Sequence, residues 1–143
     1  MESYIIIKWD ASGMHRWPNA PDIYRFLASN HHHIFHFECE IPVARSRQLE
    51  FLDVRSKMIQ LLEDRYGGDF ETLSCEQLAN IIGGMVYELF GVTPRKVSVY
   101  EDAFVGASIY WRNESDFALA IPERPESYLS DYSGVVVDTK QFK

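Results

Sequence analysis

The sequence has few cysteines, no long hydrophobic run and no excess of basic residues, and each shortage excludes a class of protein. It has 2 cysteines in 143 residues, too few for a disulfide scaffold, so we expect a reducing, cytoplasmic setting. No apolar run approaches the ~20 residues that cross a bilayer. The acidic first ten residues also lack the pattern of a secretory signal, so we expect no membrane segment.

The charge balance is acidic. Lys and Arg total 14 against 21 Asp and Glu, a formal net charge of −7. An acidic chain without a basic cluster is a poor partner for duplex nucleic acid or an anionic membrane surface, and we expect neither. Hydrophobic residues make up 46% of the chain, which at this length is typical of one globular domain.

Hydrophobic periodicity predicts an α+β domain over residues 1–112, with a four-stranded antiparallel sheet and two helices on one face. Its element order is β-β-α-α-β-β, with residues 10–30 mostly loop. The strands are expected at 3–9, 31–43, 96–102 and 105–112, and the helices at 50–65 and from about Ser74 to Gly91. Residues 113–143 are interpreted as a C-terminal extension, either a clasp or partly disordered.

Two local features mark the second helix. Ser74 and Gln77 have the spacing of a capping box at its start. Gly83 and Gly84 lie inside it, although each costs about 1 kcal/mol of helix propensity relative to Ala. Close packing against the sheet would explain why they are tolerated.

All five histidines lie between residues 15 and 36. His31 and His33 are two apart on a predicted strand, so their side chains point the same way and can share one ion. His15 is the natural third ligand, because the first two strands should pair as a hairpin. Three imidazoles and an open position suit catalytic Zn²⁺. The alternative is a partly exposed polar strand; His32 and His36 belong to its other face.

Five segments also resemble, in order, the motifs of the 6-pyruvoyl- and 6-carboxy-tetrahydropterin synthases. The family has A-H-R-L-P after its first strand, H-G-H-[NS]-[FY] opening its second, an Asp-Phe pair and P-T-x-E-x-x-A opening its helices, and V-x-V-x-E-T in its third strand. The corresponding segments here are MHRWP (14–18), HHHIF (31–35), EF (50–51), LSCEQLA (73–79) and VSVYED (97–102).

The resemblance implies the tunnelling fold (T-fold) of that family, with zinc held by His15, His31 and His33. It also implies that Glu101 anchors a pterin or purine ring by accepting hydrogen bonds from ring N–H and amino groups. An ordinary surface acid is the alternative for Glu101. Family members assemble as rings, commonly hexamers, so a homo-oligomer is expected.

The sequence departs from the family at its proton-transfer groups. Leu27 stands where the synthases have a cysteine, and Phe70 stands in place of the histidine of an Asp-His pair. Asp69 remains as the candidate catalytic residue. Cys75, near a helix N-terminus that lowers a thiol pKa, is a possible substitute; a small buried or capping residue is the favoured interpretation.

Two functions follow from these observations. The first is a zinc-dependent lyase of the tetrahydropterin synthase type, acting on a pterin or related purine with altered acid–base groups. The second is a non-catalytic T-fold ring that binds a purine-containing small molecule or nucleotide.

Overall fold

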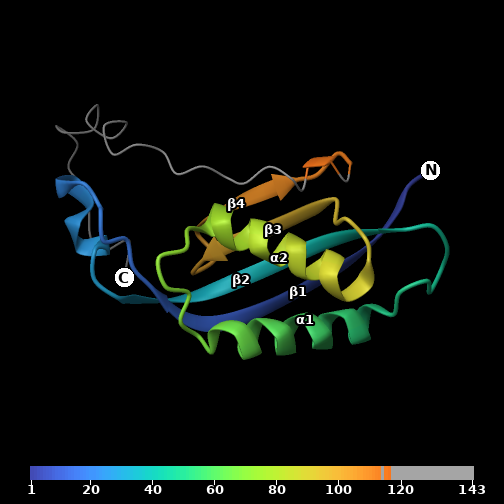
Figure 1. Ribbon diagram of the computed structural model, residues 1–143, viewed down its shortest axis with the longest axis horizontal. Coiled ribbons are helices and arrows are strands. Elements are labelled where there is room, and N and C mark those ends of the chain that lie inside the picture. The colour runs from blue at the N-terminus through green and yellow to red at the C-terminus, as the bar shows by residue number, and fades with distance from the viewer. Residues whose placement is uncertain (114, 117–143) are drawn as a thin grey trace.

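Four strands and two long helices form the part of the chain that the computed structural model describes, residues 1–113, 115 and 116 (Figure 1). The elements are β1 Ser3–His15, the 3₁₀ helix η1 Asp22–Leu27, β2 His31–Val43, α1 Phe51–Tyr66, α2 Cys75–Phe90, β3 Lys96–Glu101 and β4 Val105–Tyr110. The sheet is antiparallel in the order β1-β2-β3-β4. The predicted element order and sheet are thereby confirmed. The extension expected over 113–143 lies almost entirely outside the described residues.

Strand β1 is longer than the sequence predicts. It continues through residues 10–15, which were expected as loop, and pairs with β2 as far as His15 opposite His31. Gly13 suggested a break in the strand, but it lies inside β1. The Phe70 ring occupies the space beside it, and a Cβ on residue 13 would lie 2.4 Å from that ring. The extra length of β1 carries His15 into the sheet.

Both helices begin and end where local chemistry dictates. The predicted capping box of α2 is present: Ser74 accepts from the Gln77 N–H, and the Gln77 side chain accepts from the Ser74 N–H. Gly67 ends α1 and Gly91 ends α2, both in the left-handed conformation that glycine adopts without strain.

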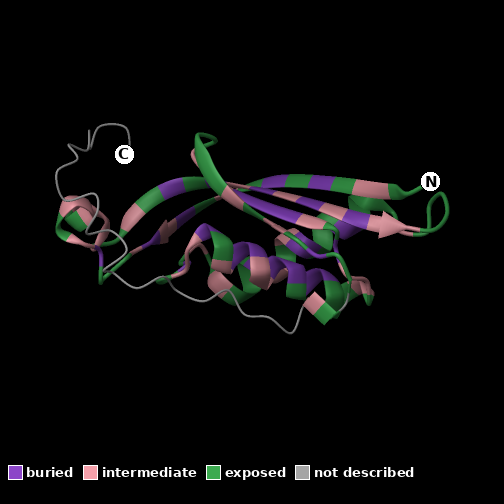
Figure 2. Cartoon of the chain, turned by 90° about the horizontal axis from the view of Figure 1, so that it is seen from above, coloured by how far each residue is buried: buried purple, intermediate pink, exposed green. Residues whose placement is uncertain are grey.

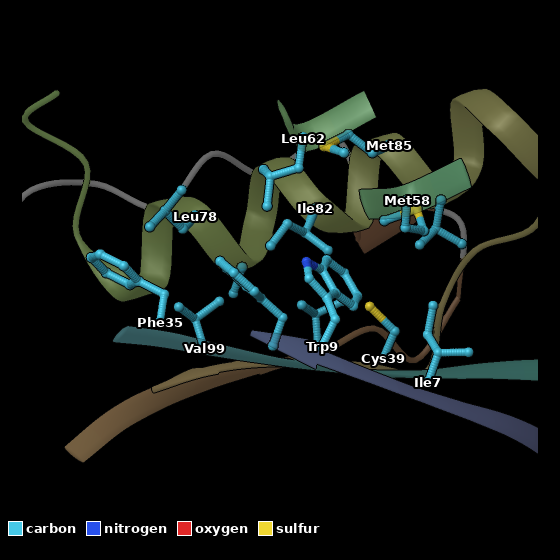
Figure 3. Close-up of a cluster of buried hydrophobic side chains, with 14 of the residues drawn as sticks. Ile7, Trp9, Phe35, Cys39, Met58, Leu62, Leu78, Ile82, Met85 and Val99 are labelled. Carbon is cyan, nitrogen blue, oxygen red and sulfur yellow. The ribbon is translucent and has the colours of Figure 1, made fainter. Parts of the chain in front are cut away.

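The core is a single layer between the sheet and the helices. α1 packs against β1, and α2 covers β3 and β4 (Figure 1). Buried and more exposed residues alternate along most of the two long strands, β1 and β2 (Figure 2), as the sequence of β2 predicts. Figure 3 shows Trp9, Cys39 and Val99 rising from the sheet toward Ile82 and Met85 of α2. Within the described residues, no helix is long and apolar enough to cross a membrane.

The two glycines inside α2 give a matched test of this packing. A Cβ on Gly83 would lie 2.5 Å from the buried Trp111 ring, whereas a Cβ on Gly84 meets no atom within 4 Å. We expect Gly83→Ala to lower the free energy of unfolding by about 1–3 kcal/mol through overpacking, less any gain in helix propensity. Gly84→Ala should raise it by up to about 1 kcal/mol. Urea unfolding measures both, and equal effects of the two substitutions would contradict the packing.

Candidate metal centre

Three histidines meet at the end of the β1–β2 hairpin. His15 ends β1 and lies opposite His31, the first residue of β2, while His33 follows on the same face. The ring centroids are 4.5 Å apart for His15 and His31, and about 5 Å apart for the other two pairs. One nitrogen from each ring lies within 4.8 Å of the other two. The structure therefore brings together the three residues that the sequence analysis selected.

Each of these rings is held by its Nδ1 atom. His15 Nδ1 donates to the Leu73 carbonyl at 3.1 Å and His31 Nδ1 to the Ser29 carbonyl at 2.9 Å. His33 Nδ1 donates to the Asp102 carboxylate at 2.6 Å. A carbonyl or carboxylate oxygen has no proton to give, so in the neutral form of each ring the proton lies on Nδ1. Each Nε2 is left with a free lone pair, as metal binding requires.

Two of these Nε2 atoms, on His15 and His33, are buried and have no hydrogen-bond partner. The Glu101 carboxylate oxygens lie 3.4 Å from one and 3.5 Å from the other, without the alignment of a hydrogen bond. Lone pairs and a negative carboxylate thus converge on one point, which is unfavourable unless a proton or a cation lies among them. The donor set of three imidazoles, with a carboxylate beside them, fits a divalent transition metal such as zinc.

Burial disfavours a proton on the His15 ring of the cluster. Burial lowers the pKa of His15, although the Leu73 carbonyl and the Glu101 charge act to raise it. Burial acts to raise the pKa of Asp102, but hydrogen bonds from His33 and the Ile34 N–H hold that pKa below its usual value. The Asp102 carboxylate therefore stays ionised, and the buried His15 ring stays neutral, at neutral pH.

Glu101 reaches the histidines because of the register of the sheet. It is the last residue of β3, it lies opposite Phe35, and its side chain is on the same inward face as His33. The Cys75 thiol donates to Glu101 Oε1 at 3.7 Å from the first residue of α2. The side chain of Glu101 keeps an exposed fraction of 24%, so a ligand can reach it.

The surroundings of Cys75 are not those of a nucleophilic thiol. Burial and the nearby Glu101 and Glu76 charges raise the pKa of Cys75, and burial and Glu38 raise that of Cys39. Burial outweighs the helix N-terminus that was expected to lower the pKa of Cys75. The structure thus agrees with a small buried residue at this position.

We expect both thiols to resist alkylation in the folded protein. An exposed thiol, with a pKa of about 8.5, reacts much faster when the pH rises from 7 to 9. Here iodoacetamide should label neither cysteine over that range, whereas both should react at once in urea. Mass spectrometry of the intact protein measures this. Rapid labelling of folded Cys75 at pH 8 would show that its thiol is ionised and accessible.

The candidate catalytic residue, Asp69, is near the cluster along the chain pairing, but its side chain contacts other residues. Its backbone forms a bridge with Met14, the residue before His15. Its side chain is largely exposed, accepts from the Glu71 N–H and lies 3.8 Å from Arg16. The neighbouring Phe70 is fully buried against Phe35 and Phe37, and it fills core space as a hydrophobic ring. None of the polar contacts of Asp69 involves one of the three histidines.

The sequence analysis missed Asp102 and the two carbonyls of Ser29 and Leu73, all of which hold the rings. Carbonyl partners leave no trace in a sequence. Asp102 can be noticed in the sequence, because it directly follows Glu101 at the position where the V-x-V-x-E-T motif of the synthases has threonine. A carboxylate beside predicted metal ligands is a signal for a histidine partner.

No family model matches the sequence, and no curated protein sequence matches it. Among solved structures, the fold is similar to that of the 6-pyruvoyl tetrahydropterin synthase of Caenorhabditis elegans, with a TM-score of 0.57 and 13% sequence identity. The match covers 78% of this chain and 96% of that one. At this identity the likeness shows the fold alone: the chain has the T-fold.

Proposed function

We propose that the chain binds zinc through the Nε2 atoms of His15, His31 and His33. The observation that carries this proposal is the convergence of the rings: one nitrogen from each lies within 4.8 Å of the other two, and each Nδ1 already contacts an oxygen outside the cluster, which leaves Nε2 as the free nitrogen. Three neutral ligands with an open position are typical of catalytic zinc. The ion would supply Lewis-acid polarisation of a ligand oxygen.

Glu101 then holds the organic ligand, a pterin or related purine. Its carboxylate lies beside the histidines and is partly open to solvent. A pterin or guanine ring offers a ring N–H next to an amino group, and one carboxylate can accept from both. The Cys75 thiol donates to one of its oxygens and restrains the carboxylate in this orientation. The likeness to a pterin synthase fold supports this choice of ligand class.

The zinc-dependent reaction would be of the tetrahydropterin synthase type, with Asp69 as the nearest candidate for the proton-transfer group. A rotation of the Asp69 side chain away from Arg16 would be needed to bring it toward the ligand. General acid–base groups contribute roughly 10²–10⁴-fold in rate, so their placement decides whether turnover occurs.

A second candidate, a non-catalytic binding protein, is favoured by the groups around the site. Phe70 is locked in the core where the synthases have a histidine, Leu27 replaces their cysteine, and Cys75 has a raised pKa. On this alternative Glu101 and the ring of T-fold subunits would capture a purine-containing molecule or nucleotide without changing it.

We also propose that copies of the chain associate into a ring, as the resemblance implies. Strands β1 and β4 are the two edges of the sheet, and β1 is 13 residues long. Open edges of this kind favour pairing between copies.

Native mass spectrometry with metal analysis tests these proposals together. The protein, expressed with zinc supplied, should carry one zinc per chain in a homo-oligomer, and incubation with pterin or guanosine should add one ligand mass per site. A ligand released with altered mass supports the enzyme, whereas an unaltered ligand supports the binding protein. Protein that binds no zinc contradicts the proposed metal site and the zinc-dependent enzyme.

A further inference from the structure

Asp102 lies in the tight turn between β3 and β4 and uses both carboxylate oxygens on β2. Its Oδ1 accepts from the Ile34 N–H at 2.8 Å, and its Oδ2 lies 2.6 Å from His33 Nδ1. Its own N–H donates to the Ile34 carbonyl at 2.8 Å. The side chain is thus fixed at two points and the backbone at a third, and the second carboxylate oxygen contacts one ring of the histidine cluster.

The three rings are not held alike. His15 and His31 donate to neutral backbone carbonyls, whereas His33 donates to an ionised carboxylate over a shorter distance. A charged acceptor makes the stronger bond and increases electron density on the far nitrogen of the ring. His33 is also the most buried of the three, so the ring end of this hydrogen bond is sheltered from water, while the Asp102 side chain is partly exposed.

The turn itself does not require a carboxylate at this position. Asp102 and Ala103 have φ values of 52° and 63°, which is the left-handed region. Among residues with a side chain, Asn and Asp adopt it most readily, so Asn would serve the turn equally well. The charge on Asp102 therefore needs a reason other than the backbone, and the contact with His33 supplies one.

We infer that Asp102 is a positioning residue for a metal ligand: it fixes the tautomer of His33, with the Nε2 lone pair toward the metal position, and strengthens His33 as a donor. The inference rests on the proposed metal site. It assigns Asp102 a part in metal affinity that the neutral acceptors of His15 and His31 do not have.

A second carboxylate–histidine pair in the chain, outside the cluster, serves as the control for Asp102. On the opposite face of the sheet, Asp10 Oδ1 lies 2.6 Å from His36 Nδ1, a carboxylate–histidine pair at the same distance. His36 does not belong to the cluster. Asp10→Asn removes the same charge and the same kind of contact without touching the metal site.

The test compares Asp102→Asn, Asp10→Asn and the unmodified protein by competition of a chelating dye for Zn²⁺. Loss of an outer partner of this kind weakens metal binding by about 10–100-fold, and we expect this for Asp102→Asn alone. In metal-free protein, long-range ¹H–¹⁵N spectra of the histidine rings should show the His33 proton on Nδ1, and Asp102→Asn should shift it toward Nε2. Urea unfolding shows whether the variants remain folded.

The outcomes distinguish failure of the positioning role of Asp102 from failure of the proposed metal site. If the unmodified protein binds Zn²⁺ tightly and folded Asp102→Asn binds it within threefold, Asp102 has no positioning role while the metal site stands. If both Asn variants weaken binding equally, a general effect of charge explains the loss, and the inference is wrong. If the unmodified protein does not bind Zn²⁺, the proposed metal site itself fails.

Discussion

Replacing His31 by Ala should lower the affinity for Zn²⁺ by about 10²–10³-fold. A four-ligand zinc site yields about 10–16 kcal/mol, or roughly 2.5–4 kcal/mol per ligand. His31 is the most exposed of the three rings, at the first residue of β2, so its loss should leave the fold intact. Chelator competition measures the affinity, and circular dichroism checks the fold.

The neighbouring His32 is the matched control for this substitution. Its side chain lies on the opposite face of β2, where its Nε2 contacts the Ser12 hydroxyl. His32→Ala should leave zinc affinity within about twofold, because it removes no atom near the cluster. If His32→Ala weakened binding as much as His31→Ala, the ion would be held elsewhere, or by the run of histidines as a flexible tract.

Replacing Phe35 by Ala should lower the free energy of unfolding by about 3–5 kcal/mol, the range for a buried Phe. The ring is fully buried, and its centroid lies 4.9 Å from that of Phe70. It also contacts the edges of His15 and His33, at 5.2 and 5.7 Å between centroids. The Phe35 ring thus packs against the histidines of the candidate site and is also part of the core.

Because domains of this size have about 5–15 kcal/mol of stability, this loss approaches unfolding. Urea unfolding of the metal-free protein measures it. Phe104→Ala is the control: this ring is 86% exposed at the β3–β4 turn and should change the stability by less than about 0.5 kcal/mol. A loss below about 1 kcal/mol for Phe35→Ala would contradict the packing under the histidines.

The sheet and the histidine cluster could be predicted because both depend on the period of a strand. Alternation along residues 31–43 places His31 and His33 on the buried face, and pairing with the first strand brings His15 within reach. The later helices follow from their caps and apolar stripes, including the Ser74–Gln77 capping box. These signals are local and act through backbone geometry.

The remaining features depend on long-range packing. The extension of β1 past Trp9 depends on Phe70, 57 residues after Gly13, filling the space beside that glycine. The contact between Cys75 and Glu101 joins a helix start to a strand end, and no local pattern predicts it. The direction of the Asp69 side chain depends on Arg16 and on the turn after α1. Sequence alone placed Asp69 near the site but could not orient it.

X-ray diffraction of crystals grown with zinc, recorded at the zinc absorption edge, tests the central claim most directly. We predict one strong anomalous peak per chain at about 2.0–2.1 Å from the Nε2 atoms of His15, His31 and His33. No peak at this position in the unmodified protein, or a peak held by other residues, would contradict the account.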